Sequence, residues 1–361
     1  MVEDIEGYVD PGFEPVRDAF AALNEPGGAL TITVDGEPVV DVWTARNWKS
    51  DSLVHVFSAT KPIVALCVLR LVEAGKLALD DRVTTVWPEF GTKGKEATTV
   101  RQLLAHQAGV VAFAEPQPLE LVLDWDRCVA QIANERPAWL PGAQHGESAL
   151  LYGHLLGELV RRLDGRHFGT YFREEIAEPL QIDIHIGIGG EVAERVVDVE
   201  DTGGRWRAQM LDGASNLQHR ALENPPGLLD TAVLNSESWR RAEIPGVNGH
   251  ASARGLARLH GALADGGALD GIPLVGPELL NEMLRVQGEG VDQVFGGEVS
   301  YGLGMRLDGG PFESAEFGYG GIGGSIAFGN RSRRLSFAFV TRCLGGPERA
   351  MALERALLKL I

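Results

Sequence analysis

Ser58 and Lys61 stand three positions apart and are the residues of this chain best suited to chemistry. On a helix, residues i and i+3 share a face, so the Lys61 amine can approach the Ser58 hydroxyl. A serine hydroxyl is a weak nucleophile at neutral pH, and a lysine desolvated in a buried helix can act as its base. The alternative is a purely structural role, with Ser58 as a helix N-cap and Lys61 as a solvated side chain one turn later.

Other common catalytic motifs are absent from the sequence. It contains no G-x-S-x-G, H-E-x-x-H, C-x-x-C or Walker A motif. One G-x-G-x-x-G runs from Gly318 to Gly323, but it leads into strand-like residues and not into the helix that a dinucleotide site needs. The nine histidines are scattered. We therefore expect neither a metal nor another cofactor.

The segment from Ser58 to Ala74 is predicted to be a buried helix, because apolar residues cover nearly its whole circumference. Strands are predicted near both ends of the chain, at 29–34 and 39–43 around a turn, and at 325–328 and 335–340. Helices are predicted at 150–163, 254–264 and 347–360. The economical packing is an α/β (α+β) fold with one antiparallel sheet from both termini. Residues 1–85 and 231–361 would form the sheet domain, and 86–230 a helical insert, with the active-site cleft between them.

Composition limits the partners of the chain. Its 361 residues carry a formal net charge of −17, from 33 Lys and Arg against 50 Asp and Glu. Nucleic acid and membrane surfaces are therefore not expected partners, whereas a small molecule is. Three widely spaced cysteines and the lack of a visible signal peptide predict a cytoplasmic protein. Homo-oligomer formation is left open.

Further motifs follow in order along the chain. Residues 55–77 surround the serine and lysine, residues 99–109 read T-V-R-Q-L-L-A-H-Q-A-G, Pro141-Gly142 comes next, and residues 317–325 are glycine-rich. Together they resemble the serine β-lactamase and penicillin-recognising superfamily, and most closely its β-lactamase-like (family VIII) carboxylesterases. The resemblance spans about residues 12–345. It implies the β-lactamase-like fold and a serine hydrolase that forms an acyl-enzyme on Ser58.

Two positions depart from the pattern of this family. The family places a tyrosine six residues after the proline of P-G, and Glu147 stands there in this chain. Related esterases carry His-x-Gly or Trp-x-Gly in the third motif, where this chain has Tyr319. One hypothesis is that Glu147 and Tyr319 share the proton-transfer and orienting roles; the other is that Tyr319 only lines the pocket. Tyr152 is a weaker candidate for a displaced phenol and fits the core better.

The resemblance also implies an oxyanion hole from the backbone N–H groups of Ser58 and Ile322. The adjacent Gly320 and Gly321 fit this role, because glycines let backbone approach a substrate closely. Arg342 stands where the family often has an asparagine, near the end of the last strand. It could bind a substrate carboxylate or pair with a surface acid. His106, in the second motif quoted above, is expected to be structural.

The expected activity is ester hydrolysis on a small molecule, with Lys61 as general base. Two alternatives remain open. One is a specialised amidase or acyltransferase acting on a small metabolite. The other is a catalytically silent binding protein that keeps the fold, an option that the carboxylate of Glu147 in the tyrosine position favours.

Overall fold

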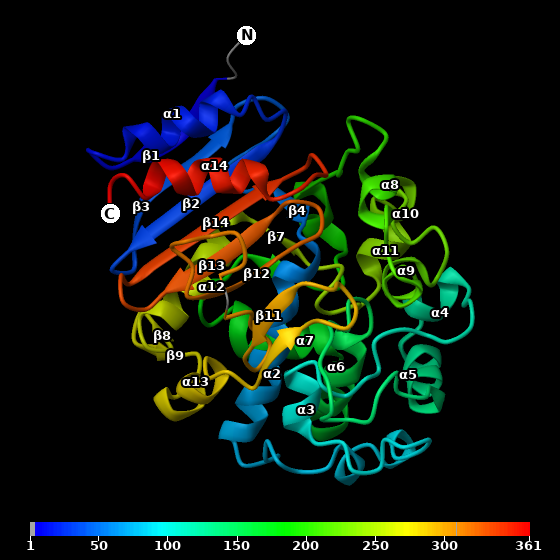
Figure 1. Ribbon diagram of the computed structural model, residues 1–361. Helices are drawn as coiled ribbons and strands as arrows, with labels where there is room; N and C mark the ends of the chain where they lie inside the picture. The colour runs from blue at the N-terminus through cyan, green and yellow to red at the C-terminus, as the bar shows by residue number, and fades with distance from the viewer. Residues whose placement is uncertain (1–3, 308) are drawn as a thin grey trace.

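The computed structural model describes residues 4–307 and 309–361, and its centre is a six-stranded antiparallel sheet in the order β1-β3-β2-β14-β13-β12. Figure 1 shows that this sheet joins the two ends of the chain. The strands are β1 (Ile5–Val9), β2 (Gly28–Val34), β3 (Glu37–Thr44), β4 (Leu53–His55), β5 (Ile184–His185), β6 (Val196–Val197), β7 (His250–Ala251), β8 (Ala268–Leu269), β9 (Ile272–Pro273), β10 (Gly288–Val291), β11 (Glu298–Tyr301), β12 (Phe317–Gly320), β13 (Ile326–Asn330) and β14 (Leu335–Thr341).

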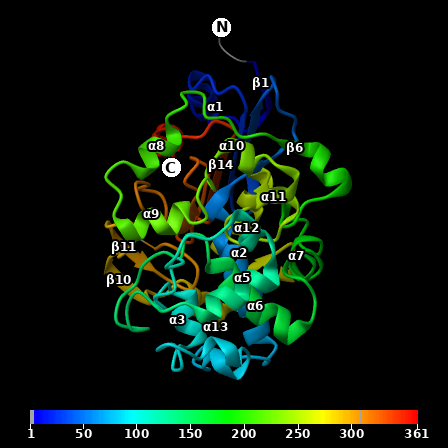
Figure 2. The same ribbon diagram turned by 90° about the vertical axis from the view of Figure 1, so that its right-hand side faces the viewer.

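Helices cover the sheet on both faces and fill the rest of the molecule (Figures 1 and 2). They are α1 (Glu14–Ala22), α2 (Lys61–Glu73), α3 (Val100–Leu104), α4 (Leu119–Leu123), α5 (Trp125–Asn134), α6 (Tyr152–Asp164), α7 (Phe168–Phe172), α8 (Trp206–Leu211), α9 (Asn216–Glu223), α10 (Thr231–Leu234), α11 (Glu237–Arg241), α12 (Ala253–Ala264), α13 (Pro277–Met283) and α14 (Glu348–Leu357). Among the described residues, none of these helices is long and apolar enough to cross a membrane.

The pairing of the first and last strands confirms the predicted sheet. β2 and β3 form the expected hairpin, in which Asp35 and Gly36 both adopt positive φ angles of 53° and 83°. Such angles at both turn positions suit the right-handed twist of a hairpin. β14 then pairs with β2, with Phe337 opposite Ile32. The turn from β13 to β14 follows Asn330, whose side-chain oxygen accepts the Arg333 N–H at 2.9 Å.

The two faces of the sheet bury separate sets of apolar side chains. α1 and α14 lie side by side on one face, where Phe20 and Leu353 pack with Ile32 and Phe339. α12 packs against β2, β13 and β14 on the other face. β1 and α1 were not predicted from the sequence, because the short run of residues 5–22 mixes charged and apolar residues without a clear period.

The middle of the chain lies beside this sheet, and Figure 2 shows α5, α6 and α8–α11 on the side turned toward the viewer. The prediction of a purely helical insert at residues 86–230 is incomplete, because this segment also contains strands. β5 and β6 belong to a second, four-stranded sheet in the order β5-β7-β4-β6. That sheet ties the middle segment to the strand just before Ser58. The domain bounds at 85/86 and 230/231 stay a prediction.

The predicted helix from Ser58 onward is divided into two parts. Residues Phe57–Thr60 form a 3₁₀ turn, and α2 begins at Lys61. Phe57 has a left-handed φ of 49°, which turns the chain sharply from β4 into this 3₁₀ turn. α2 packs on α6, and β12 lies against the 3₁₀ turn. Ser58 and Lys61 therefore sit where the helical part meets the edge of the six-stranded sheet.

Candidate active site

Ser58 and Lys61 are in direct contact. Lys61 Nζ lies 2.7 Å from Ser58 Oγ. The lysine side chain is fully buried and Ser58 is 7% exposed, so of the two residues only Ser58 lines the neighbouring cavity. This geometry removes the alternative of a capping serine with a solvated lysine: the Ser58 side chain caps no helix, and Lys61 has no access to water.

Two backbone carbonyls orient the Lys61 amine. Nζ donates to the oxygen of Ala149 at 3.0 Å and to that of Gly246 at 3.1 Å. As an ammonium, Nζ donates its third hydrogen to Ser58 Oγ. As a neutral amine, it uses both hydrogens in these two bonds and leaves its lone pair facing Ser58 Oγ. Burial lowers the pKa of Lys61, and the nearby Glu147 carboxylate offsets only part of that decrease. Burial thus shifts this lysine toward its neutral, basic form.

Glu147 completes a triangle with the serine and the lysine. Its Oε1 lies 3.1 Å from Lys61 Nζ and accepts the Ser58 hydroxyl at 3.3 Å. The Glu147 backbone is held by Asp292, whose Oδ2 accepts its N–H at 2.9 Å. Burial alone would raise the pKa of Glu147, but its neighbours Lys61, His106 and Arg306 together outweigh burial, and the pKa lies below its ordinary value. Glu147 is therefore a carboxylate at neutral pH.

Tyr319 lies in the same cavity, on β12. Its ring is 5.7 Å from Lys61 Nζ, and its hydroxyl forms a hydrogen bond of 3.3 Å with His106 Nε2. Burial raises the pKa of Tyr319, and the Glu147 carboxylate raises it further. Tyr319 is thus a neutral phenol, and the sequence-derived pair of Glu147 and Tyr319 does meet at one site.

A cavity of about 370 Å³ opens in front of these groups. Its walls include Ser58, Glu147 and Tyr319, and one rim is formed by Gly320, Gly321 and Ile322. A Cβ on Gly321 would lie 2.3 Å from the Val56 oxygen, so only glycine allows this rim to approach the turn before Ser58. The Ile322 N–H has no acceptor within the described residues, and it lies at the cavity beside Ser58.

A second, smaller space adjoins Ser58. We call it the apolar pocket; it measures about 30 Å³. It shares Ser58, Glu147, Phe295 and Ile322 with the main cavity, and its remaining walls are apolar: Phe57, Ala149, Leu150, Ala221, Leu222, Leu228, Leu229, Leu234, Trp239 and Val247. The nucleophile therefore stands between a larger, partly polar cavity and a small hydrocarbon-lined one.

Two predicted residues lie elsewhere. The hydroxyl of Tyr152 donates to the Leu104 oxygen at 3.1 Å and is buried in the core, which agrees with the packing alternative. Arg342 pairs with Glu200 and donates to the Asp198 oxygen at 3.2 Å, so of its two alternatives the pairing with an acid is the one seen. Neither residue lines the cavity.

Sequence reasoning missed Asp292 and Tyr301. Tyr301 donates to Asp292 Oδ2 at 2.9 Å, the same oxygen that holds Glu147. Nothing in the local sequence signals the contact between Asp292 and Glu147, because these residues are 145 positions apart. Among the described residues, no three His, Cys, Asp or Glu side chains are placed to hold a metal ion.

Comparisons with known proteins agree with this geometry. Residues 16–360 match the β-lactamase family. The chain is 34% identical over 368 residues to the esterase/β-lactamase LipL of Mycobacterium tuberculosis (strain ATCC 25618 / H37Rv), covering 94% of this chain and 83% of that protein. A crystal structure of a family VIII carboxylesterase superposes with a TM-score of 0.90 at 32% identity, covering 99% of this chain and 100% of the other. The crystal structure of a penicillin-binding protein homologue from Caulobacter crescentus superposes with a TM-score of 0.89 at 35% identity, again covering 99% of this chain and 100% of the other.

The fold and the serine–lysine site define a serine hydrolase. The chain belongs to the β-lactamase family, and the fold expected from its sequence motifs is confirmed over nearly the whole chain.

Proposed function

We propose that this protein hydrolyses small carboxylic esters through an acyl-enzyme on Ser58. The observation that carries the proposal is the 2.7 Å contact between a fully buried lysine amine and a serine hydroxyl at the wall of a cavity. The esterases among its relatives support the ester as substrate. The three cysteines are free and buried, which supports the cytoplasmic location proposed from the sequence.

In the first half of the reaction, Lys61 takes the Ser58 proton while Ser58 Oγ forms a bond to the ester carbonyl carbon. The negative charge that develops on the carbonyl oxygen is stabilised by the N–H groups of Ser58 and Ile322. The bond from the carbonyl carbon to the alcohol oxygen then breaks. The proton on Lys61 reaches this oxygen, directly or through Glu147 Oε1, which lies 3.1 Å from the amine.

In the second half, water attacks the acyl group and loses a proton to the same lysine and glutamate. Ser58 Oγ regains a proton as the acid leaves, so the protein returns to its starting state. Glu147 suits this role because its carboxylate contacts both Ser58 and Lys61 and can hold a proton between the two steps. A carboxylate thereby takes the place that a phenol has in related enzymes.

The test compares Ser58→Ala with the unaltered protein on short-chain p-nitrophenyl esters. Loss of the nucleophile is expected to lower kcat by about 10³-fold or more. Ser252→Ala is the matched control, since Ser252 caps α12 away from the cavity and its loss affects stability only. Turnover that survives Ser58→Ala while Ser252→Ala is also active would exclude the proposed mechanism.

A further inference from the structure

His106 is buried among the aromatic side chains behind the cavity. Its ring centroid lies 4.4 Å from that of Tyr152 and 4.8 Å from that of Tyr301. Its backbone has a left-handed φ of 57°, and its carbonyl accepts the Gly146 N–H at 3.0 Å, next to Glu147. A non-glycine residue in this conformation carries strain, which the surrounding contacts must hold in place.

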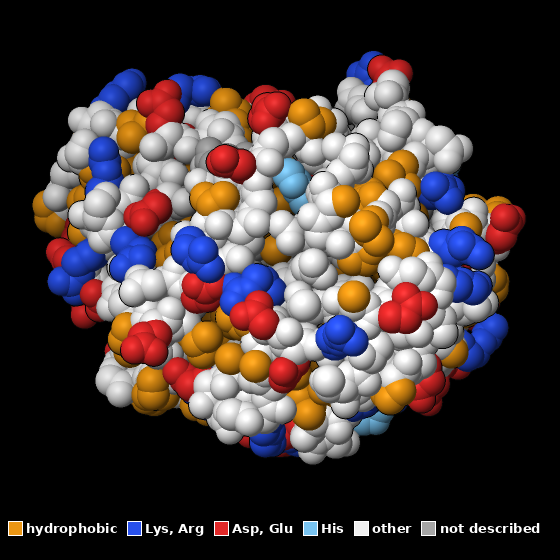
Figure 3. Space-filling model, turned by 60° about the horizontal axis from the view of Figure 1, so that its bottom comes forward, with side chains coloured by type: hydrophobic (Ala, Val, Ile, Leu, Met, Phe, Trp, Pro, Cys, Tyr) orange, Lys and Arg blue, Asp and Glu red, His pale blue; other side chains and the backbone are white. Residues whose placement is uncertain are grey.

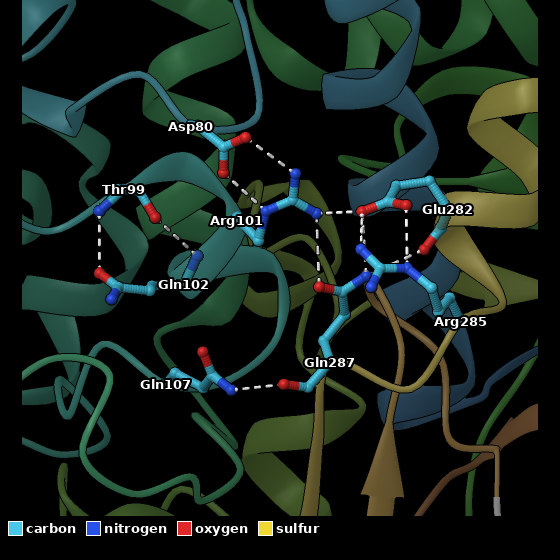
Figure 4. Close-up of polar contacts among 8 residues, drawn as sticks. All are labelled: Asp80, Thr99, Arg101, Gln102, Gln107, Glu282, Arg285 and Gln287. Carbon is cyan, nitrogen blue, oxygen red and sulfur yellow. Dashed lines mark hydrogen bonds and ion pairs between the residues drawn. The ribbon is translucent and has the colours of Figure 1, made fainter.

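The turn that contains His106 is anchored on both sides, as Figure 4 shows. Before it, the Thr99 and Gln102 side chains cap α3, and Arg101 bridges Asp80 and Glu282. After it, Gln107 Nε2 donates to the Gln287 oxygen at 2.8 Å. The ring of His106 is thus fixed relative to the cavity by contacts outside it.

The hydrogen bonds of the His106 ring define its tautomer. Nδ1 accepts the Ser148 N–H at 3.3 Å, so this nitrogen carries a lone pair. Burial lowers the pKa of His106 to about 3, so the ring is neutral and its single proton is on Nε2. Nε2 therefore donates to the Tyr319 hydroxyl oxygen, 3.3 Å away.

This donation decides the direction of the Tyr319 hydroxyl. Because the oxygen accepts from His106, its own hydrogen must point elsewhere. Within the described residues, the Tyr319 hydroxyl has no second hydrogen-bond partner, and the residue lines the main cavity with Ser58 and Glu147. The hydrogen is then available to a substrate oxygen in that cavity.

We propose that His106 is a positioning residue that turns the Tyr319 hydroxyl into a fixed hydrogen-bond donor for the alcohol oxygen of the ester. The proposal rests on the proposed function. It assigns the proton-transfer and orienting roles to different residues. Glu147 and Lys61 move the proton, and Tyr319 donates a hydrogen bond without changing its own protonation. Tyr319 touches the substrate, whereas His106 acts through it.

Two substitutions at position 106 distinguish the role of the His106 Nδ1 from that of its Nε2. Asn can still accept from the Ser148 N–H and tolerates a left-handed φ, but it cannot reach Tyr319. Gln can place an N–H near the position of Nε2 and so can still donate to Tyr319. His106→Asn, His106→Gln, Tyr319→Phe and the double variant His106→Asn/Tyr319→Phe are assayed on ethyl acetate and on p-nitrophenyl acetate, with kcat and KM measured separately.

The expected result depends on the leaving group. The departure of the alkoxide from the ethyl ester depends more on the hydrogen bond from Tyr319 than the departure of p-nitrophenolate does. His106→Asn and Tyr319→Phe should each lower kcat for the ethyl ester about tenfold, the effect of one neutral hydrogen bond, and leave the p-nitrophenyl ester within about twofold. The double variant should be no slower than Tyr319→Phe, and His106→Gln should recover most of the loss.

His154→Asn is the control for a buried histidine outside the cavity: it should lower thermal stability without changing the ratio of the two esters. Equal losses on both esters in His106→Asn, additive effects in the double variant, or no rescue by a folded His106→Gln would each overturn the role of His106. Those results would leave the esterase proposal intact, because turnover in Ser58→Ala tests that proposal separately.

Discussion

At the scale of single residues, the chemistry depends on how many partners surround one lysine nitrogen. Two carbonyls and one carboxylate lie within 3.1 Å of Lys61 Nζ, with Ser58 Oγ nearest of all. The sequence predicted Ser58 and Lys61 from their spacing, and Glu147 from its place after Pro141. It could not predict the link from Tyr319 to His106, because these residues are 213 positions apart and only the fold brings them together.

The effect of the Glu147 charge on the pKa of Lys61 predicts how activity depends on pH. Glu147 raises the pKa of Lys61, so removing its charge in Glu147→Gln lowers that pKa further. The active form needs a neutral lysine, and the acidic limb of the kcat/KM profile should therefore move to lower pH. The rate at the plateau should fall, because the proton relay is lost. A pH–rate profile checks both effects.

An acidic limb that stays in place, or moves to higher pH, in a folded Glu147→Gln would contradict the assignment of this limb to Lys61. Glu135→Gln serves as the control, since Glu135 is also buried but accepts from Ala114 and Gln131 far from Ser58 in sequence and outside the cavity.

At the scale of elements, the site depends on one sharp turn and one close approach. The left-handed Phe57 turns the chain from β4 into the 3₁₀ turn that holds Ser58, and Gly321 lets the end of β12 reach the backbone before that turn. The strands and helices themselves followed from apolar periodicity. The sharp turn at Phe57 did not, because phenylalanine is not a residue type that favours a positive φ, and only the packing around it selects that conformation.

The apolar pocket yields a prediction on substrate size. Tyr319 lines the main cavity and not the apolar pocket, so an alcohol that reaches Tyr319 leaves the acyl group on the side of the pocket. Leu234 is a wall of this pocket and is 1% exposed. Leu234→Ala should raise kcat/KM for p-nitrophenyl hexanoate relative to acetate about tenfold, since each methylene in a matched pocket has effects of this order.

Leu353→Ala is the matched control, because Leu353 is also buried but lies on α14, in the separate core against the six-stranded sheet. Both variants should lose about 2–5 kcal/mol of unfolding free energy. An unchanged chain-length preference in a folded Leu234→Ala would place the acyl group in the main cavity instead.

At the scale of the whole molecule, both ends of the chain build one sheet, and the middle segment closes the site against its edge. This architecture was predictable because strand patterns occur at both ends. The small sheet of β4–β7 was not, since strands of two or three residues carry no measurable period. Figure 3 shows cationic and anionic side chains interspersed on the lower face, so the net charge of −17 does not exclude local ion pairs such as Arg101 with Asp80.

Buried histidines should make the fold sensitive to mild acid. Burial lowers the pKa of His154 and of His250 to about 3, and that of His260 to about 4. Their ordinary value is about 6.5, so the unfolded chain binds protons first as the pH falls. Each group therefore contributes its full stability above pH 6.5 and loses it progressively down to pH 3–4, at a cost of about 1.4 kcal/mol by pH 5.5.

Urea unfolding at pH 7.5 and 5.5 checks this prediction. His154→Phe should reduce the difference in unfolding free energy between the two pH values by about 1.4 kcal/mol, because it removes one such group. A pH dependence that is unchanged in His154→Phe would mean that this histidine is not held neutral by the fold.

The proposed mechanism makes Ser58 the nucleophile and Lys61 its base. The most direct measurement is mass spectrometry of the protein after reaction with a serine-reactive phosphonate, followed by peptide mapping. One adduct is expected on Ser58, formed much more slowly in Lys61→Ala and absent in Ser58→Ala. An adduct on another residue, or no adduct on a protein that turns over esters, would contradict it.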